Sequence, residues 1–435
     1  MAAPPPLTDP VTDPQAGPTN GDLSRMTYGN DDFVPIILGT NVNTYNVARS
    51  LHEAFGVRSL ALGRYPLRET AHSRIVDVRT SRDLDSPEVL VRTLLALAEE
   101  LPGRTRILIP NIELYATILL EHRAELEEHF VIPLVDADLA ARLMNKSSFA
   151  RICAELGVPH PATVVVTPTT PRDAALGADL PFPYPVVVKP ADTDTYPRLR
   201  FEGKQKVYVV ADAAELRAVA DRVYAAGYTD DLVVQELIPG DETVMRVANA
   251  YCDRDGRMRV LSVGQVALAE WDPRWAGNYN AILTVEDPGL TESIRRLLDG
   301  LGYVGFANLD VMVDRRDGTS KILEVNLRLG ACSHYAMAAG ANLPRCLVDD
   351  VVHGKEVPEL TTTAERLWVN LPYLAALAFV PGSLRRRVVA AARHGVRHTL
   401  YYRPDLSLAR ILDVVRIDLR HTLDYLRYAR TRLNR

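Results

Sequence analysis

The amino-acid sequence predicts an N-terminal α/β domain with a doubly wound parallel sheet, then an α+β region, then a basic helical tail. Over 32–138, short apolar runs such as Phe33 to Leu38 alternate with amphipathic stretches such as Val42 to Phe55. That rhythm is typical of parallel sheets covered by helices. Beyond it, long alternating strands between Thr243 and Glu270 favour antiparallel pairing. At 435 residues the chain is long enough for about two to four domains.

The composition is that of an ordinary globular protein, with 47% hydrophobic and 24% charged residues. It excludes a collagen-like chain, a coiled coil and wholesale disorder. The formal charge of −5 offers no basic field for nucleic acid. The four cysteines form no C-x-x-C pair, which argues against a disulfide framework or a zinc site. No secretory signal and no run of 18 apolar residues is found, so we expect a cytoplasmic location.

The two ends of the chain differ from its middle. Residues 1–31 are rich in proline and poor in large apolar side chains, and we expect a disordered leader. Residues 366–435 hold 14 arginines and four acids, so this segment carries +10 and the remainder −15. We therefore expect a helical, basic C-terminal extension over 358–435.

The most informative stretch is a predicted hairpin of Phe306 to Val313 with Ser320 to Leu327. Asp317-Gly318 lies between the two runs and is a strong turn signal. If the turn centres on Asp317, Asp310 lies opposite Glu324.

Along the second strand, Glu324, Asn326 and Arg328 alternate onto one face. Two carboxylates that face each other repel unless a cation lies between them, and oxygen ligands of this kind suit Mg²⁺. The pattern is also compatible with a solvated sheet face that carries an incidental Arg–Glu pair.

Lysine is scarce in this chain, which has 6 lysines and 44 arginines. Lys146 follows Asn145 at the start of a predicted helix, where an anion can meet backbone N–H groups. Lys189 ends the apolar strand that begins at Pro185. A single lysine of this kind is more often an ordinary surface residue. Gln235 to Glu242 contains a strand end and a Pro-Gly turn that could contact a nucleoside, or could be an ordinary strand end.

The order of these features resembles the ATP-grasp superfamily over roughly 140–355. The resemblance implies a small lobe over 139–240 and a large lobe over 241–357, behind the α/β domain of 32–138. It implies ATP and Mg²⁺ as cofactors, with two ions expected and Mn²⁺ as an alternative. Neither a P-loop nor a kinase catalytic loop is present.

The resemblance also assigns roles to residues of this chain. For the nucleotide, it implies that Lys146 and Lys189 bind phosphates, that Glu236, Leu237 and Ile238 bind adenine, and that Glu242 binds ribose. For the metal, it implies Asp310, Glu324 and Asn326 as ligands. It also implies that Arg328 stabilises the transferred charge. The loop from Ala191 to Lys206 is expected to close as a lid that excludes water, with Lys204 and Lys206 as catalytic cations.

A narrower resemblance, to D-aspartate ligases, appears in the run from Phe33 to Ser50, the loop from Phe201 to Lys206, the run from Asn326 to Tyr335, and the basic tail. It implies ATP-dependent joining of the β-carboxyl of D-aspartate to a side-chain amine of a peptidoglycan precursor. D-alanine–D-alanine ligases carry arginine two residues before the metal aspartate, where this chain has Asn308. The alternatives are a ligase of the same fold that makes a small peptide metabolite and an ATP-binding module without turnover.

The tail contains apolar residues at helical spacing. They are Leu408, Ile411, Leu412, Val415, Leu419 and Leu426, and Arg410, Arg416, Arg420, Arg427 and Arg430 lie largely on other faces. Such a helix either packs its apolar side on the body, with the arginines facing the acidic remainder, or makes a peripheral contact with an anionic membrane at the inner face.

Overall fold

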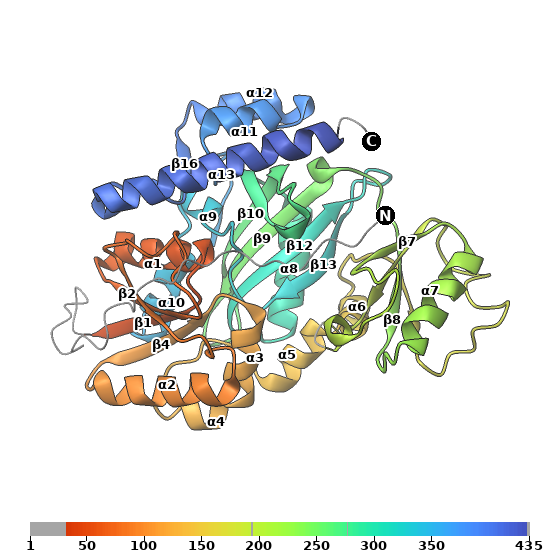
Figure 1. Ribbon diagram of the computed structural model, residues 1–435, viewed down its shortest axis with the longest axis horizontal. Coiled ribbons are helices and arrows are strands. Elements are labelled where there is room, and N and C mark those ends of the chain that lie inside the picture. Colours follow the sequence, from red (N-terminus) through yellow and green to blue (C-terminus); the bar gives the residue numbers. More distant parts are fainter. Residues whose placement is uncertain (1–31, 193–194, 276, 433–435) are drawn as a thin grey trace.

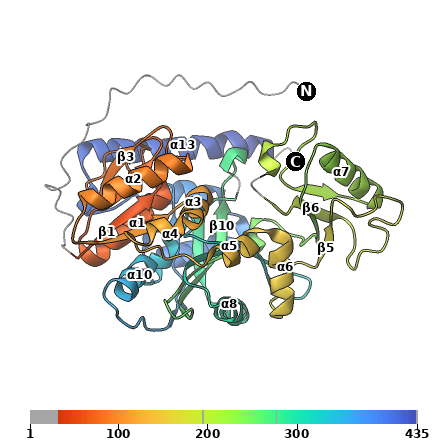
Figure 2. The same cartoon turned by 90° about the horizontal axis from the view of Figure 1, so that it is seen from below.

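The computed structural model describes residues 32–192, 195–275 and 277–432, and Figures 1 and 2 show its three sheets and their helices. The predicted leader, residues 1–31, lies outside the described residues. One sheet is parallel and precedes one antiparallel and one mainly antiparallel sheet, as the mixed fold class requires. Within the described ranges no helix is long and apolar enough to cross a membrane.

The N-terminal sheet has the strand order β3-β2-β1-β4 and is parallel throughout. Its strands are β1 (Phe33–Leu38), β2 (Ser59–Gly63), β3 (Val76–Thr80) and β4 (Thr105–Pro110), and its helices are α1 (Val42–Phe55), α2 (Pro87–Glu100), α3 (Glu113–Glu121) and α4 (Arg123–Leu126). Alternate residues of β1 pack against α2 on one side and against α1 on the other. That double covering is why β1 is apolar along its whole length. Asn41 caps α1 by accepting hydrogen bonds from the N–H groups of Asn43 and Thr44.

The small antiparallel sheet has the order β5-β8-β6-β7. Its strands are β5 (Thr163–Val166), β6 (Val186–Pro190), β7 (Tyr208–Val210) and β8 (Leu232–Glu236), and its helices are α5 (Ala137–Met144), α6 (Lys146–Glu155), α7 (Ala213–Ala225) and the short 3₁₀ turn η2 (Tyr196–Arg198). The helical stretch is interrupted at Asn145, so α6 begins at Lys146, where the sequence analysis expected a helix to start. The Asn145 side chain caps α6 by accepting from the N–H groups of Ser147 and Ser148. The interruption gives Lys146 the first position of a new helix.

The large sheet is mainly antiparallel and has the order β13-β12-β9-β10-β11-β15-β16; β14 pairs with β10, and the pairs β10–β14 and β15–β16 are parallel. Its elements up to residue 351 are η3 (Glu242–Val244), β9 (Met245–Cys252), β10 (Met258–Ala269), η4 (Pro273–Trp275), β11 (Tyr279–Val285), α8 (Pro288–Gly300), β12 (Gly305–Val313), β13 (Ser320–Asn326), α9 (Tyr335–Ala338) and α10 (Leu343–Val351). The largest hydrophobic cluster joins this sheet to the N-terminal domain, because β12 and β1 contribute to the same core. The two parts are therefore held together by apolar burial, the main driving force of folding.

The C-terminal segment contributes strands as well as helices. It contains β14 (Leu360–Thr361), β15 (Leu367–Val369), α11 (Tyr373–Phe379), α12 (Gly382–Ala392), β16 (Val396–His398), η5 (Arg403–Asp405) and α13 (Leu408–Arg432). The sequence prediction of a helical extension did not include β14 to β16, which extend the large sheet. Figure 1 shows α11, α12 and α13 together beside this sheet.

Candidate active site

The hairpin of β12 and β13 places Asp310 opposite Glu324, as the turn arithmetic predicted. The turn is closed by a hydrogen bond from the Asp314 N–H to the Thr319 carbonyl, 2.8 Å long. A register shift follows immediately after the pair, between Asp310 and Val311. Such irregularities re-aim side chains and are frequent near active sites. The expected pairing is therefore confirmed.

Asp310 lies close enough to Glu324 for the charge of Glu324 to disfavour ionisation of Asp310. Burial raises the pKa of Asp310, and the neighbouring charge of Glu324 raises it further. The Tyr279 hydroxyl donates to Asp310 Oδ1 at 3.1 Å, and this hydrogen bond lowers the pKa of Asp310. Tyr279 lies on β11, a strand that the sequence analysis did not identify. A divalent cation between the two carboxylates would remove their repulsion, so the pair fits a metal site.

Asn326 lies two residues along β13 from Glu324, on the same face. Its amide nitrogen donates to the carbonyl and side-chain oxygens of Asn308 at 3.4 and 3.3 Å. This leaves the Asn326 Oδ1 atom as the ligand it could offer a metal. Across the described ranges, no group of three or more His, Cys, Asp or Glu residues could hold a metal ion. The smaller set of two carboxylates and one amide therefore remains a prediction.

Arg328 lies two residues beyond the end of β13 and reaches into the N-terminal domain. Its Nε atom lies 2.6 Å from the Oε2 atom of Glu113, the first residue of α3. Its Nη1 atom donates to the Leu329 carbonyl at 3.1 Å. The partner Glu113 lies 215 positions earlier in the chain, and no sequence pattern pointed to it. The interface between β13 and α3 therefore sets the direction of this guanidinium.

The two predicted phosphate lysines face the carboxylates from the small lobe. Lys146 begins α6 and Lys189 lies on β6, and both are half-buried. Burial lowers the pKa of each lysine, and the negative charge of Glu324 opposes that shift in both cases. Lys206 also acts on both lysines, as a like charge that lowers their pKa. Side chains from α6, β6, β13 and the loop before β7 thus share one electrostatic environment.

Lys204, the other predicted loop cation, is oriented differently. Its ammonium group donates to the carbonyls of Pro197 and Leu199, both at 2.7 Å, and lies 5.3 Å from the centre of the Tyr196 ring. These contacts organise the loop itself. Residues 193–194 of the predicted lid lie outside the described residues.

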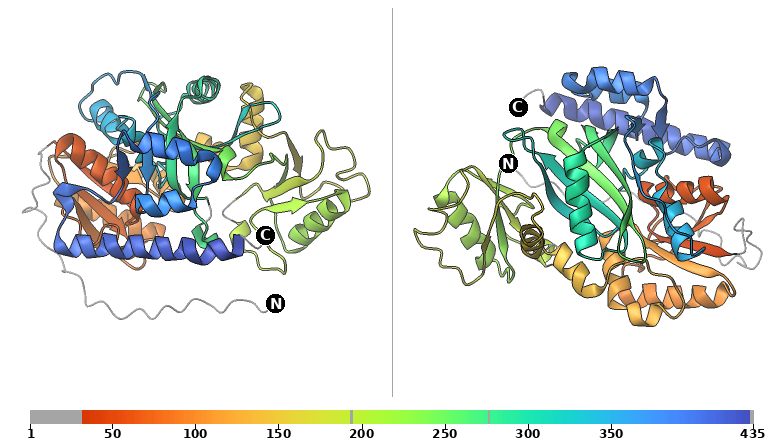
Figure 3. Two further views of the ribbon diagram at one scale, coloured as in Figure 1. Left: turned by 90° about the horizontal axis from the view of Figure 1, so that it is seen from above. Right: turned by 180° about the vertical axis from the view of Figure 1, so that it is seen from behind.

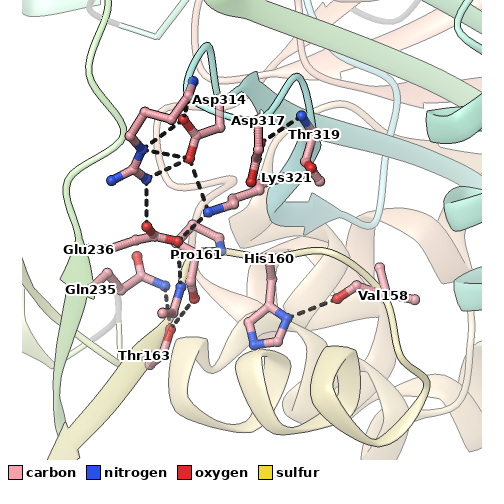
Figure 4. A network of polar contacts seen from close by, with 12 residues as sticks. Val158, His160, Pro161, Thr163, Gln235, Glu236, Asp314, Asp317, Thr319 and Lys321 are labelled. Atoms are coloured by element: carbon pink, nitrogen blue, oxygen red, sulfur yellow. Dashed lines mark hydrogen bonds and ion pairs between the residues drawn. The ribbon is translucent and has the colours of Figure 1, made fainter. Parts of the chain in front are cut away.

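Glu236 ends β8 and joins the small lobe to the hairpin turn, as Figure 4 shows. Its carboxylate accepts from Lys321, from the Ala162 N–H at 3.0 Å and from Arg316 at 2.6 Å. Lys321 also lies 3.1 Å from Asp314. Burial alone would raise the pKa of Glu236, but these hydrogen bonds lower it overall. We call the set of Glu236, Asp314, Arg316 and Lys321 the lobe clamp.

The clamp was not foreseen, although Lys321 was among the six lysines that the sequence makes conspicuous. Because the Glu236 carboxylate contacts the cations of the clamp, we no longer interpret this side chain as an adenine contact. Leu237 and Ile238 follow it directly, and Glu242 opens η3 at the start of the large lobe. The segment predicted for the nucleoside therefore connects the two lobes.

The surface hollow between α5, α6 and α8 is a separate feature. It is lined by residues such as Arg142, Glu155 and Leu301 and includes none of the predicted site residues. We therefore place the candidate site where the lysines and carboxylates meet, and not in this hollow, because a phosphate and metal site is defined by the charged groups and donors that line it.

A parallel α/β domain, a small antiparallel sheet, a larger and mainly antiparallel sheet, and lysines of α6 and β6 that share an electrostatic environment with carboxylates of the large sheet are the features of an ATP-grasp enzyme. Solved structures show the same fold. The L-amino acid ligase of Bacillus licheniformis has a TM-score of 0.52 at 16% identity and covers 74% of each chain. An ADP complex of N5-carboxyaminoimidazole ribonucleotide synthetase has a TM-score of 0.55 at 14% identity and covers 82% of this chain and 85% of that one.

Sequence comparison is more specific. The chain is 34% identical to the D-aspartate ligase of Enterococcus faecium (strain Aus0004) over 395 residues, which cover 88% of this chain and 93% of that protein. It is 27% identical to the D-alanine–D-alanine ligase of Xylella fastidiosa (strain Temecula1 / ATCC 700964) over 248 residues, 52% of this chain and 72% of that protein. No protein-family model matches the chain. The chain belongs to the D-aspartate ligase family of ATP-grasp carboxylate–amine ligases.

The protein is thus an enzyme that forms C–N bonds at the expense of ATP, with ADP as a product. Like other ATP-grasp ligases, it uses ATP and Mg²⁺ as cofactors. This outcome confirms the ligase assignment and excludes the alternative of a module without turnover.

Proposed function

We propose that this ligase joins the β-carboxyl of D-aspartate to a side-chain amine of a peptidoglycan precursor. The observation that carries the proposal is the 34% identity to a D-aspartate ligase over most of both chains. Asn308 supports it, since the corresponding position of D-alanine–D-alanine ligases is an arginine. Asn308 is buried and donates to the Ala248 carbonyl at 3.4 Å.

A free carboxylate is a poor acceptor for an amine because resonance stabilises it. Transfer of the γ-phosphoryl group of ATP to one carboxylate oxygen breaks the terminal phosphoanhydride bond and yields ADP and an acyl phosphate. The amine then attacks the acyl carbon, loses a proton, and expels inorganic phosphate to leave an amide. The protein contributes mainly position and charge to such a sequence.

In this proposal the charged residues divide the work by lobe. Lys146 and Lys189 hold phosphate oxygens from the small lobe. Asp310, Glu324 and Asn326 hold metal, for which we infer two Mg²⁺ sites that could also accept Mn²⁺. When bound, the metal would neutralise charge on the phosphate oxygens.

Arg328 is suited to the transferred phosphoryl group or the acyl oxygen, because a guanidinium is a fixed fork of donors. Its contact with Glu113 holds it at the border between β13 and the N-terminal domain. We infer that the acid substrate lies on this border, within reach of Arg328.

The remaining roles follow the connection between the lobes. Backbone groups from Glu236 to Ile238 would face adenine, since the Glu236 side chain belongs to the clamp, and Glu242 would face ribose. Lys206 lowers the pKa of Lys146 and Lys189 as a like charge, so we assign this loop cation to the phosphates. Lys204 would order the loop through its carbonyl contacts.

The test is ADP release by the purified enzyme, with D-aspartate, L-aspartate and D-alanine each offered with and without a purified peptidoglycan precursor. We expect release above background only when D-aspartate and the precursor are both present, with a product heavier by one aspartyl residue. Turnover with small amino acids as acceptors would favour the peptide-metabolite alternative instead. Contact of α13 with an anionic membrane would be a separate property, because α13 lies outside the lobes that hold the charged site.

A further inference from the structure

The C-terminal helix α13 leaves a long aliphatic surface exposed. We call this surface the outer stripe; its members are Leu408, Ile411, Leu412, Val415, Leu419, Leu423 and Leu426. Their exposed fractions run from 42% for Ile411 to 84% for Leu408. Figure 3 shows α13 running along one edge of the molecule in its left-hand view. A continuous apolar stripe on the outside of a protein usually marks an interaction surface.

The opposite face of α13, which packs on the body, is mixed: Val414, Ile417 and Tyr425 join the hydrophobic cores, and charged side chains are buried beside them. Arg410 is fully buried and lies 3.3 Å from Asp405, with its guanidinium 4.3 Å from the centre of the Tyr45 ring. Asp413 is paired with His72 at 2.5 Å, and Asp418 accepts from the Tyr401 hydroxyl at 2.6 Å.

An ordinary surface helix has one apolar side, which faces the core, whereas α13 has a buried apolar side and a second, exposed one. Because the outer stripe is exposed, the interpretation in which it packs on the body is wrong. Since the helix is attached by its buried face, the stripe is not required to attach it.

The charges on α13 are divided between the same two faces. Arg416, Arg420 and Arg427 are exposed beside the outer stripe. Among the acids, Asp413 and Asp418 are buried against the body, and Asp424 is half-buried within electrostatic range of Arg274. The outward side of the described helix thus combines aliphatic groups with cations. A partner surface that matches this side of α13 must therefore offer both hydrocarbon and negative charge.

The spacing of the stripe adds a geometric constraint. From Leu408 to Leu426 it takes five steps over 18 residues, through Leu412, Val415, Leu419 and Leu423. This is the 3.6-residue period of a straight helix, so the stripe stays on one side of a straight rod about 37 Å long. A supercoiled helix pair would favour a 3.5-residue period. A two-fold contact with a second copy would also bring the same arginines of two chains together; Arg416 and Arg420 already have acids of their own chain, Asp413 at 3.9 Å and Glu69 at 3.5 Å, and Arg427 would meet its like.

We propose that the outer stripe docks the enzyme on an anionic lipid bilayer, with α13 lying in the plane of the interface. The leucines enter the boundary between headgroups and acyl chains, while Arg416, Arg420 and Arg427 meet headgroup phosphates. Such a helix lies on the membrane and does not cross it. The docking does not depend on which acid or amine the enzyme joins.

The test is flotation of the full chain with vesicles of phosphatidylcholine, with or without phosphatidylglycerol, in the absence of substrates. The central variant is Leu419→Gln with Leu423→Gln, both in the outer stripe and both exposed, so the helix contacts with the body remain. The matched control is Val165→Gln with Val209→Gln, two exposed apolar residues of the small sheet. A third variant, Arg416→Gln with Arg427→Gln, removes charge only.

We expect the parent and the control to float with anionic vesicles, and the parent to be released by high salt. The stripe variant should bind roughly tenfold or more weakly, in line with the loss of two embedded leucines. The arginine variant should lose the preference for anionic over neutral vesicles. An unchanged thermal midpoint shows that each variant is folded.

Three outcomes would overturn the proposal. The first is a parent that does not float with anionic vesicles. The second is a folded stripe variant that binds them as the parent does. The third is a dimer in solution, measured by light scattering, that the stripe variant converts to monomer, because a second copy would then cover the stripe. A failure of D-aspartate ligation leaves all three readouts unaffected.

Discussion

The lobe clamp gives the most quantitative prediction, through the substitution Lys321→Met. Lys321 is only 13% exposed and contacts the carboxylates of Glu236 and Asp314, the latter at 3.1 Å. Removing one partner of a buried ion pair costs about 3–5 kcal/mol. Arg316 still pairs with both acids after the substitution, so we expect a loss of about 2–3 kcal/mol in the free energy of unfolding.

The effect should depend on pH with a definite sign. Hydrogen bonds hold the pKa of Glu236 and Asp314 below their ordinary values in the folded protein, with Arg316 as the largest cause for Asp314. A depressed folded pKa adds stability above the unfolded pKa, about 4, and that stability is lost as pH falls through the folded value. The difference between parent and variant should therefore be full at neutral pH and shrink below about pH 4.

The assay is urea unfolding followed by circular dichroism, together with hydrogen exchange of the amides of β8. Exchange is included because the small lobe can open before the rest of the chain. The matched control is Lys355→Met, which removes a lysine that is 60% exposed and pairs with Asp349 at 2.8 Å. We expect the control to cost less than about 0.5 kcal/mol. Equal losses for the two variants would refute the view that the clamp joins the lobes.

Three further predictions concern catalysis. Asp310→Asn and Glu324→Gln should each lower ligation by about 10²–10³-fold while the thermal midpoint is retained, and normal turnover with Mg²⁺ would contradict the metal assignment. Lys189→Arg should lose most activity despite its charge, because a planar fork cannot replace a point donor at a phosphate; parental ATP affinity by calorimetry would make the lysine structural only. Glu113→Gln removes the ionic partner of Arg328, so KM for the acid substrate should change more than KM for ATP. An unchanged ratio of these two KM values would show that the contact does not position the arginine.

Local patterning was sufficient for most of the elements and for the hairpin. Short apolar runs predicted β1 and β6, and a helical repeat predicted α1, because each depends on residues a few positions apart. The pairing of Asp310 with Glu324 followed from one turn signal, since hairpin register is set locally. β11 was missed although Gly277 and the run Asp287-Pro288-Gly289 flank it, and β14 to β16 are too short to show a period.

The tertiary structure determined which partner each charged side chain finds. The contact of Arg328 with Glu113 joins residues 215 positions apart, and the clamp joins Glu236 to a turn about 80 residues later. The sequence also showed that α13 is amphipathic but not which side packs inward. That choice depends on Asp405, His72 and Tyr45. Asp405 and Tyr45 are buried partners of Arg410, and His72 pairs with the buried Asp413 from an exposed position. A buried charge without a partner is far more costly than an exposed leucine.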